Sequence, residues 1–472
     1  MASRIQLAKI QFPKIGFPKE TRPELSAAVF ARRLARTRRR MSERGLDALV
    51  VYGDREHYGN IAWLTNYDPR FEEALLIVQP RGTPILFVGN EGMVYSNVAR
   101  LNVQRRLCQT FSLLGQPRGS ARPLADLLRA AGLGKCGRVG TAGWKYFSPA
   151  EVRDPDGAFD VPEFIITALR AAIQPGGRVG NETALFMDAG CGLRNLLEPE
   201  QIADFEWVAT HNSESLLRGL RDIRPGMTEM EGFSKMRVNG LPWCCYPVCA
   251  TGERVRKYFM PSPTSATIQR GEPIFMTMSY QGATSCRFGW VARGPKDLAA
   301  QVRDYVERVA APYFDSLAAW YGTLCIGASG DALHHAVWDR LTPRGFTLSL
   351  NIGHQIAADE WTHSMVSDGS TQIVRSGMYW QSDFFATLPT PHVGAAAEDG
   401  VVVADARLRS TLMSRYPVTW GRFEVRRKFM REQLGLAIAE DLLPMSNLCG
   451  AVIPFFQSPD LCVVTRQEAR HG

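Results

Sequence analysis

Helical patterns alternate with short apolar runs along the first part of the chain, and this alternation limits the possible folds more than any other feature. Residues 26–43 have the spacing of a helix, and the apolar run 46–52 follows them as a buried strand. Two more apolar runs, 73–78 and 84–88, flank a Pro-Arg-Gly turn and predict a hairpin. The pattern therefore predicts a small α/β domain at the N-terminal end.

The length of the chain requires more than one hydrophobic core. With 472 residues, the chain exceeds the size at which a single core usually stops growing. A long helix is predicted to begin at 198–200, where a proline suits the first turn and two glutamates suit the positive helix end. We place the domain boundary near residue 195 and expect domains over 1–195 and 196–472.

The positive charge of the chain does not indicate a nucleic-acid partner. The formal net charge is +8, and arginines concentrate between residues 32 and 40, inside the predicted helix. Phe30, Leu34 and Met41 lie near one face of that helix, so a solvated opposite face explains the arginines. The sequence has no basic runs interleaved with aromatic residues, which nucleic-acid grooves usually need.

The sequence also lacks the patterns of a membrane or secreted protein. No apolar run approaches the roughly 20 residues that span a bilayer, and the first residues lack the hydrophobic core of a signal peptide. Ten cysteines are scattered along the chain without a framework, and reduced thiols are their default state. We expect a cytoplasmic protein that has no membrane partner.

Six short segments between residues 223 and 399 carry a resemblance to a known family. They are IRPGMTE (223–229), YPVCATG (246–252), IQRGE (268–272), NIGHQI (351–356), VRSGM (374–378) and GAAAED (394–399). Their order and spacing resemble the creatinase, aminopeptidase P and prolidase superfamily. Three further segments, YGDREH (52–57), DPRFEE (68–73) and LLPMSN (442–447), resemble an Xaa-Pro aminopeptidase-like branch of it. The resemblance implies an α/β N-terminal domain plus an α+β C-terminal domain of the pita-bread (creatinase-like) type. It also implies a homodimer.

The hairpin that should carry metal ligands in this superfamily has none. Metal-using members hold two ions with two Asp on a hairpin, one His and two Glu. Between Glu272 and Asp297 this sequence has no carboxylate, and the position of the first Asp is Thr277. The resemblance assigns the other three ligand positions to His354, Asp383 and Glu398.

These departures change the expected chemistry. Two divalent ions about 3.5–4 Å apart need bridging carboxylates, so we expect no di-metal centre. A single divalent metal on His354, Asp383 and Glu398 is chemically reasonable, but no cofactor is predicted. The superfamily also has metal-free members that use a histidine as acid and base, and no histidine lies between His211 and His334, where that residue belongs.

Further residues are candidates for substrate binding. On the altered hairpin these are Tyr280 and Cys286, and close after His354 they are Trp361 and His363. The resemblance adds Arg55, His57 and Arg70 of the N-terminal domain, since that domain contributes to the pocket in relatives. An arginine there would bind a substrate carboxylate, whereas an ordinary ion pair within the loop is the alternative.

Three functions remain open from the sequence. The favoured one is a diverged hydrolase or lyase that acts on a small polar metabolite without a di-metal centre, with His354 as acid and base and with Asp383 and Glu398 supporting it. The second is a mononuclear metal enzyme that uses the same three residues. The third is a catalytically inactive binding protein.

Overall fold

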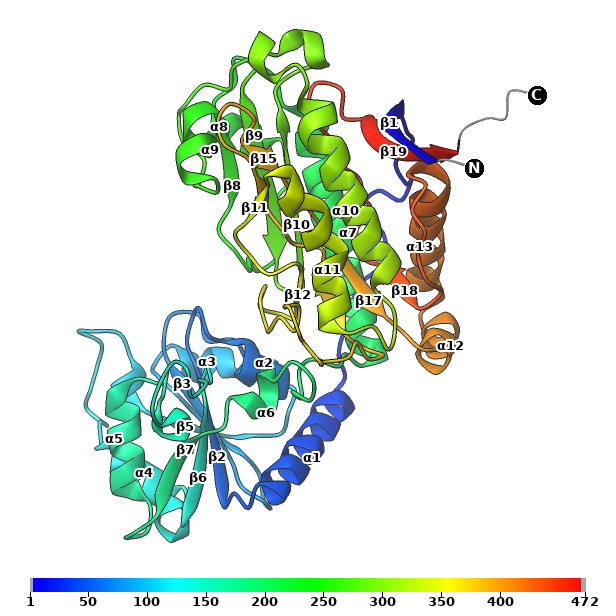
Figure 1. Cartoon of the computed structure of the whole chain (residues 1–472). Helices are drawn as coiled ribbons and strands as arrows, with labels where there is room; N and C mark the ends of the chain where they lie inside the picture. The colour runs from blue at the N-terminus through cyan, green and yellow to red at the C-terminus, as the bar shows by residue number, and fades with distance from the viewer. Residues whose placement is uncertain (1–2, 468–472) are drawn as a thin grey trace. The chain divides into compact units, whose positions relative to one another are not determined.

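A six-stranded sheet with helices on both faces forms the unit of residues 24–195 in the computed structural model, which describes residues 3–467 (Figure 1). The strand order is β5-β4-β3-β2-β6-β7. The strands are β2 (Ala48–Gly53), β3 (Ala74–Val78), β4 (Ile85–Val88), β5 (Gln104–Leu107), β6 (Arg138–Ala142) and β7 (Arg178–Asn181). The helices include α1 (Ala27–Glu43), α2 (Gly59–Thr65), α4 (Leu124–Ala130), α5 (Glu163–Ala172) and α6 (Ala184–Met187).

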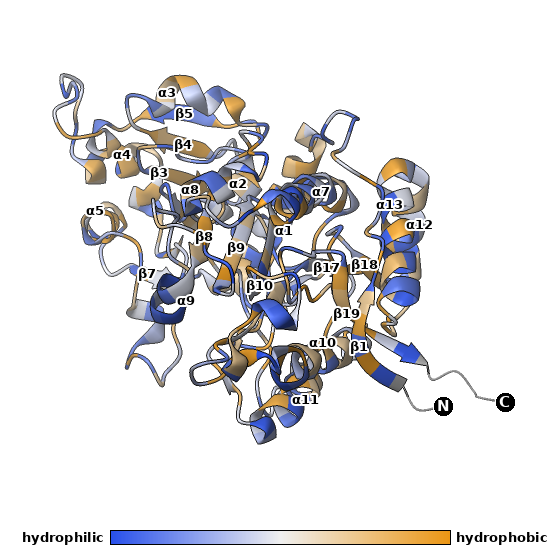
Figure 2. Cartoon of the chain, turned by 90° about the horizontal axis from the view of Figure 1, so that it is seen from above, coloured by the Kyte–Doolittle hydropathy of each residue, from blue (hydrophilic) through white to orange (hydrophobic). Residues whose placement is uncertain are grey.

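Alternate residues of the strands divide the core of this unit in two. Val50 and Tyr52 of β2 pack with the apolar side chains of α4 and α5, whereas Leu49 and Val51 pack with those of α1, α2 and α6. A sheet that is covered on both faces needs apolar residues on both faces, and β3 and β4 accordingly appear in orange in Figure 2. The predicted helix 26–43 and the strand runs 46–52, 73–78 and 84–88 are confirmed within two residues at each end.

The arginines of α1 are more engaged than a solvated helix face requires. Arg33 is buried, donates to the carbonyl of Trp63 at 2.8 Å and lies over its ring. Arg38 donates to the carbonyl of Gln79 at 2.9 Å. Part of the basic run therefore holds α1 on its own sheet, and the solvated-face interpretation applies only to its exposed members, such as Arg32 and Arg39.

The second unit contains residues 196–472 and is built on antiparallel sheets. One sheet has the order β16-β10-β9-β8 and another β12-β13-β17-β18. Their strands are β8 (Val248–Thr251), β9 (Pro273–Tyr280), β10 (Ala283–Trp290), β12 (His354–Gln355), β13 (Tyr379–Gln381), β16 (Ala397–Glu398), β17 (Gly400–Val403) and β18 (Leu442–Pro444). A smaller sheet joins β11 (Thr347–Leu348), β14 (Ala386–Thr387) and β15 (Gly394–Ala395).

Helices cover these sheets. The long helix α7 (Pro199–Asp222) packs on β9 and β10, and Gly219 allows the close approach, because a Cβ there would lie 3.0 Å from the side chain of Met276 in β9. The other helices of this unit are α8 (Glu229–Ser234), α9 (Gly252–Tyr258), α10 (Ala311–Thr323), α11 (Gly330–Leu341), α12 (Ala406–Arg415) and α13 (Pro417–Lys428). Over residues 3–467, no helix has the length and apolar character needed to cross a membrane.

Residues 3–23 do not group with the N-terminal domain, to which the sequence-based prediction assigned them. They group with residues 196–472 because β1 (Ser3–Lys9) pairs antiparallel with β19 (Leu461–Gln467), close to the other end of the chain (Figure 1). Further along, Arg22 forms an ion pair with Asp204 of α7 at 2.6 Å. Backbone pairing and ion pairs thus attach this segment to the larger unit.

Candidate functional site

The sheet that contains the hairpin β9–β10 presents Thr277, Cys286 and Glu398 on one face. Thr277 lies opposite Cys286 in the register of the two strands, and Cys286 lies opposite Glu398 of β16. Side chains that are directly opposite in a sheet point to the same face. Asp399, the next residue, points to the other face, where its carboxylate accepts from buried Arg287 at 2.6 Å. Because successive side chains alternate between the two faces of a strand, Glu398 lies on the same face as Thr277 and Asp399 does not.

A neighbouring sheet supplies His354 and Asp383. His354 begins β12 and lies opposite Gln381 of β13. Asp383 follows β13 by two residues, and its carbonyl accepts from the backbone N–H of Gly353 at 2.8 Å. The two side chains approach each other, with 3.6 Å between His354 Nε2 and Asp383 Oδ2.

A short loop adds Glu360, which the sequence interpretation missed. Two backbone hydrogen bonds close this loop. The N–H of Gln355 donates to the carbonyl of His363 at 2.6 Å, and the N–H of Thr362 donates to the carbonyl of Gln355 at 2.9 Å. The closure brings Glu360 Oε1 to 3.0 Å from His354 Nε2. The available signal was a carboxylate six residues after His354, but nothing local to the sequence shows that the loop folds back.

Four side chains thus form one group, which we call the His–carboxylate cluster: His354, Glu360, Asp383 and Glu398. Each offers one ligand atom, and these atoms all lie within 4.8 Å of one another. His354, Asp383 and Glu398 are buried, whereas the side chain of Glu360 is 22% exposed. The structure therefore brings the three predicted residues together and leaves Glu360 as the member that water can reach.

The cluster has more acidic groups than basic ones. Its three carboxylates face one imidazole, and no arginine or lysine pairs with them within residues 3–467. Burial, followed by the charges of Asp383 and Glu360, raises the pKa of Glu398 well above its usual value. Burial also raises the pKa of Asp383 to about 7, although His354 opposes the shift.

The pKa of His354 is raised as well, and for an imidazole a raised pKa favours the charged form. Burial alone would lower its pKa, but the charge and hydrogen bond of Glu360 and the charge of Asp383 outweigh burial, and the pKa is raised. Its ring stacks on Trp361 at 4.1 Å between centroids, and Nδ1 lies 3.3 Å from the carbonyl oxygen of Gln355. These contacts fix the ring so that Nε2 points toward the carboxylates.

The donor set fits a single divalent metal ion. Asp383 Oδ1 and Glu398 Oε1 are buried and have no hydrogen-bond partner in the described part of the chain. Unpaired buried carboxylate oxygens are costly unless a cation or a proton satisfies them. One imidazole with carboxylates suits Mn²⁺, Fe²⁺, Co²⁺ or Zn²⁺, and these residues could hold one such ion between them.

The other two candidates on the hairpin behave differently. The thiol of Cys286 contacts Glu398, but burial and the charges of Glu398 and Asp383 raise its pKa well above the usual value. A protonated thiol is a poor nucleophile. Tyr280 does not join the cluster: it lies three residues after Thr277 and so points to the opposite face, where its ring packs on Trp243 at 5.2 Å.

The remaining predicted residues have local partners. The carbonyl of His363 accepts from Gln355 in the loop closure, so its main chain has a structural role. In the unit 24–195, Arg55 pairs with Glu56 at 3.1 Å, His57 with Asp54 at 3.0 Å and Arg70 with Asp68 at 3.4 Å. These ion pairs match the loop alternative, and substrate binding by the three residues stays a prediction.

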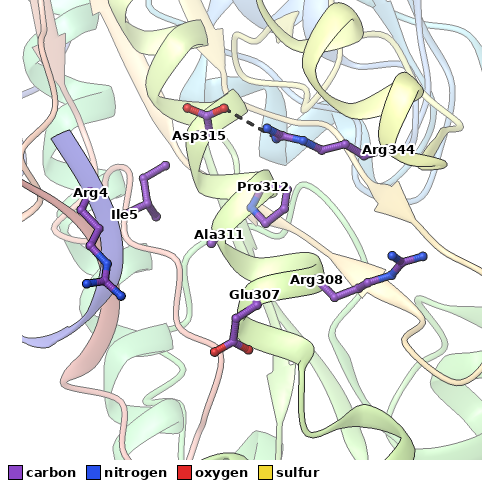
Figure 3. Close-up of a pocket in the computed structure, with 8 residues that line it drawn as sticks. All are labelled: Arg4, Ile5, Glu307, Arg308, Ala311, Pro312, Asp315 and Arg344. Carbon is purple, nitrogen blue, oxygen red and sulfur yellow. Dashed lines mark ion pairs between the residues drawn. The ribbon is translucent and has the colours of Figure 1, made fainter. Parts of the chain in front are cut away.

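A surface hollow of about 620 Å³ lies elsewhere on the larger unit (Figure 3). It is lined by Arg4, Ile5, Glu307, Arg308, Ala311, Pro312, Asp315 and Arg344. Arg344 is paired with Asp315 at 3.7 Å, as the dashed line in Figure 3 marks. The hollow has no residue in common with the His–carboxylate cluster, and its mixed charges favour no class of ligand.

Comparison with known proteins agrees with this architecture. Residues 33–205 match the creatinase/prolidase N-terminal domain family. Among solved structures, prolidase from Pyrococcus horikoshii OT3 has a TM-score of 0.60 and 14% identity over 79% of this chain and 95% of its own. The Xaa-Pro dipeptidase from Bacillus anthracis has a TM-score of 0.59 and 14% identity over 80% of this chain and 96% of its own. A variant of aminopeptidase P from Escherichia coli has a TM-score of 0.57 and 14% identity over 81% of this chain and 93% of its own.

The chain therefore has the two-part fold of the creatinase, prolidase and aminopeptidase P superfamily, the pita-bread superfamily. The predicted fold class, an α/β N-terminal domain plus an α+β pita-bread domain, is confirmed. No curated protein matches the sequence. At 14% identity the structural likeness defines the fold and not the reaction.

Proposed function

We propose that this chain is a diverged hydrolase that acts on a small nitrogen-containing or carboxylate-bearing metabolite with one divalent metal ion per chain. The observation that carries the proposal is the buried His–carboxylate cluster, in which three carboxylates face a single imidazole. Glu360 favours this function over metal-free acid–base chemistry, because its carboxylate adds negative charge that a bound cation would balance. The superfamily fold makes an enzyme plausible.

A second ion in the same site is disfavoured by the hairpin. Thr277 and Cys286 lie opposite each other where bridging ligands would be needed. A hydroxyl and a protonated thiol cannot offset the repulsion between two divalent ions that lie about 3.5–4 Å apart. One ion requires only the residues that are present.

The buried residues of the cluster and the more exposed Glu360 would have different roles. His354, Asp383 and Glu398, which are buried, would hold the ion. When bound, the ion would act as a Lewis acid and lower the pKa of a water molecule. Glu360, the most exposed member, has its Oε1 3.0 Å from His354 Nε2, and this oxygen would accept the proton of the attacking water.

Xaa-Pro peptidase activity should be absent. The reason is the loss of both hairpin carboxylates, which removes the bridging nucleophile of a two-metal site. Release of proline from Xaa-Pro dipeptides in Mn²⁺ or Co²⁺ should not exceed a blank without enzyme. Cleavage that is strong in the wild type and lost in His354→Ala would contradict the proposal.

A panel of small N-acyl amino acids tests the positive side of the proposal, with the released amine as the readout. Turnover should require added metal and should fall by about 10²–10⁴-fold in Glu360→Gln, since a general base contributes that much. Metal binding should survive in this variant. Turnover that persists in Glu360→Gln would remove Glu360 from the proposed role.

The metal-free protein should lose stability as the pH rises from about 5 to 8. Asp383, with a pKa of about 7, holds its proton in the folded state, whereas an unfolded aspartate loses it near pH 4. The folded state then binds more protons, so the free energy of unfolding falls as the pH rises; raised pKa values of His354 and Glu398 act in the same direction. Calorimetry in EDTA at pH 5, 6.5 and 8 measures this change.

The matched control is the double variant Asp383→Asn, Glu398→Gln, which should show a weaker pH dependence. Added Mn²⁺ should stabilise the wild type more at pH 8 than at pH 5, because metal ligands must be deprotonated. A wild-type stability in EDTA that rises over this range would contradict the assignment.

The proposal keeps the homodimer that the family resemblance predicts. Light scattering coupled to size-exclusion chromatography gives the test.

A further inference from the structure

Four phenylalanines form a second group beside the His–carboxylate cluster. We call Phe259, Phe275, Phe288 and Phe385 the phenylalanine cluster. The ring of Phe259 lies 5.1 Å from Phe275, 6.0 Å from Phe288 and 5.0 Å from Phe385 between centroids. Phe275 and Phe385 are 5.8 Å apart.

The strand register places this group directly next to the candidate site. Phe275 lies opposite Phe288, just as Thr277 lies opposite Cys286. Residues two apart along a strand share a face and are separated by about 7 Å. Phe275 and Phe288 are therefore the next pair on the face that carries Glu398. Phe385 follows Asp383 by two residues.

Phe259 differs from the other three rings in burial and in backbone. Phe275, Phe288 and Phe385 are at most 6% exposed, whereas Phe259 is half-buried between the exposed side chains of Tyr258 and Met260. Its φ of 62° and ψ of −60°, with a 2.8 Å bond from Met260 N–H to the carbonyl of Tyr258, form a γ-turn. This turn is strained for a residue with a side chain.

We infer that the phenylalanine cluster is a specificity subsite for an apolar group of the substrate, and that Phe259 is the ring this group displaces. The inference rests on the proposed function and adds to it: the substrate is amphipathic, with an aromatic or branched aliphatic group next to its polar reacting end. The four rings already contact one another, so an apolar group can enter only where a ring leaves. Phe259 is the ring that borders solvent and whose turn is strained.

The consequence is a separation of roles along one face of the sheet. The His–carboxylate cluster would bind the polar end and the bound ion, and the three buried rings would cover the apolar group. Burial of a benzyl group removes a large apolar area from water. Displacement of Phe259 costs part of this favourable free energy, because its ring loses its contacts with the other three rings. Release of the strained γ-turn offsets part of that cost.

Two hydroxamates test the inference, because hydroxamates chelate divalent metals. Titration calorimetry with Mn²⁺-loaded protein compares glycine hydroxamate with phenylalanine hydroxamate, which differ by one benzyl group. The wild type should bind the phenylalanine compound about 10-fold more tightly. In Phe259→Ala that preference should rise to about 100-fold, because no ring has to be displaced. Affinity for glycine hydroxamate should stay the same.

Phe164→Ala is the matched control, since it removes a half-exposed ring from the other unit, and it should behave as the wild type does. Equal binding of the two hydroxamates by both the wild type and Phe259→Ala would overturn the inference and leave the metal site intact. Failure of both compounds to bind any of these proteins would overturn the metal site and the subsite with it.

Discussion

Replacement of His354 by alanine should weaken the binding of Mn²⁺ by at least about 100-fold, since loss even of a supporting contact to a ligand typically costs 10–100-fold. His354 is fully buried, and stacking on Trp361 together with the contact to the Gln355 carbonyl fixes its ring. Among residues 3–467, no other histidine belongs to the cluster. Titration calorimetry at pH 7.5 measures the affinity.

Glu360→Gln is the control for this experiment. It keeps the volume of the side chain and removes a charge at the edge of the cluster, so the affinity for Mn²⁺ should fall by no more than about 10-fold. Circular dichroism should show that both variants are folded, because neither change removes a large apolar side chain. Wild-type affinity in His354→Ala would mean that the ion binds elsewhere.

Replacement of Glu206 by alanine should lower the free energy of unfolding by about 3–5 kcal/mol, the usual cost of breaking a buried ion pair. Glu206 lies in α7 and accepts from Arg426 of α13 at 2.5 Å and from Arg422 at 2.8 Å. Glu206 and Arg426 are fully buried. The variant leaves buried guanidinium charge without its carboxylate, which is the main reason for the cost.

Urea unfolding at pH 7 measures this effect, and Glu432→Ala gives the comparison. Lys428 and Glu432 are 3.9 Å apart and mostly exposed, so their pair should contribute at most about 1 kcal/mol. If Glu206→Ala were as stable as Glu432→Ala, the ion pairs between α7 and α13 would not hold these helices together.

The sequence predicted local elements well and distant pairings poorly. The runs 46–52 and 73–78 became β2 and β3 because their apolar residues are continuous and turn residues bound them. The pairing of β1 with β19 was missed, since the two strands lie at opposite ends of the chain and no periodicity reports such a partner. A register between remote strands depends on the whole fold.

The candidate site shows the same division. His354, Asp383 and Glu398 were available from motif positions, whereas Glu360 reaches them through a loop closed by Gln355 and His363. The direction of Tyr280 could have been predicted, because residues three apart in a strand point to opposite faces. The phenylalanine cluster could not, since it joins two strands of a hairpin to the end of α9 and to Phe385.

The number of metal ions per chain tests the central claim most directly. Protein prepared with EDTA, dialysed against excess Mn²⁺ and then freed of unbound metal, should contain one ion per chain by elemental analysis. The double variant Asp383→Asn, Glu398→Gln should contain almost none, because it removes two of the three buried ligands. Two ions per wild-type chain, or one ion retained by the double variant, would contradict a single-metal site in the His–carboxylate cluster.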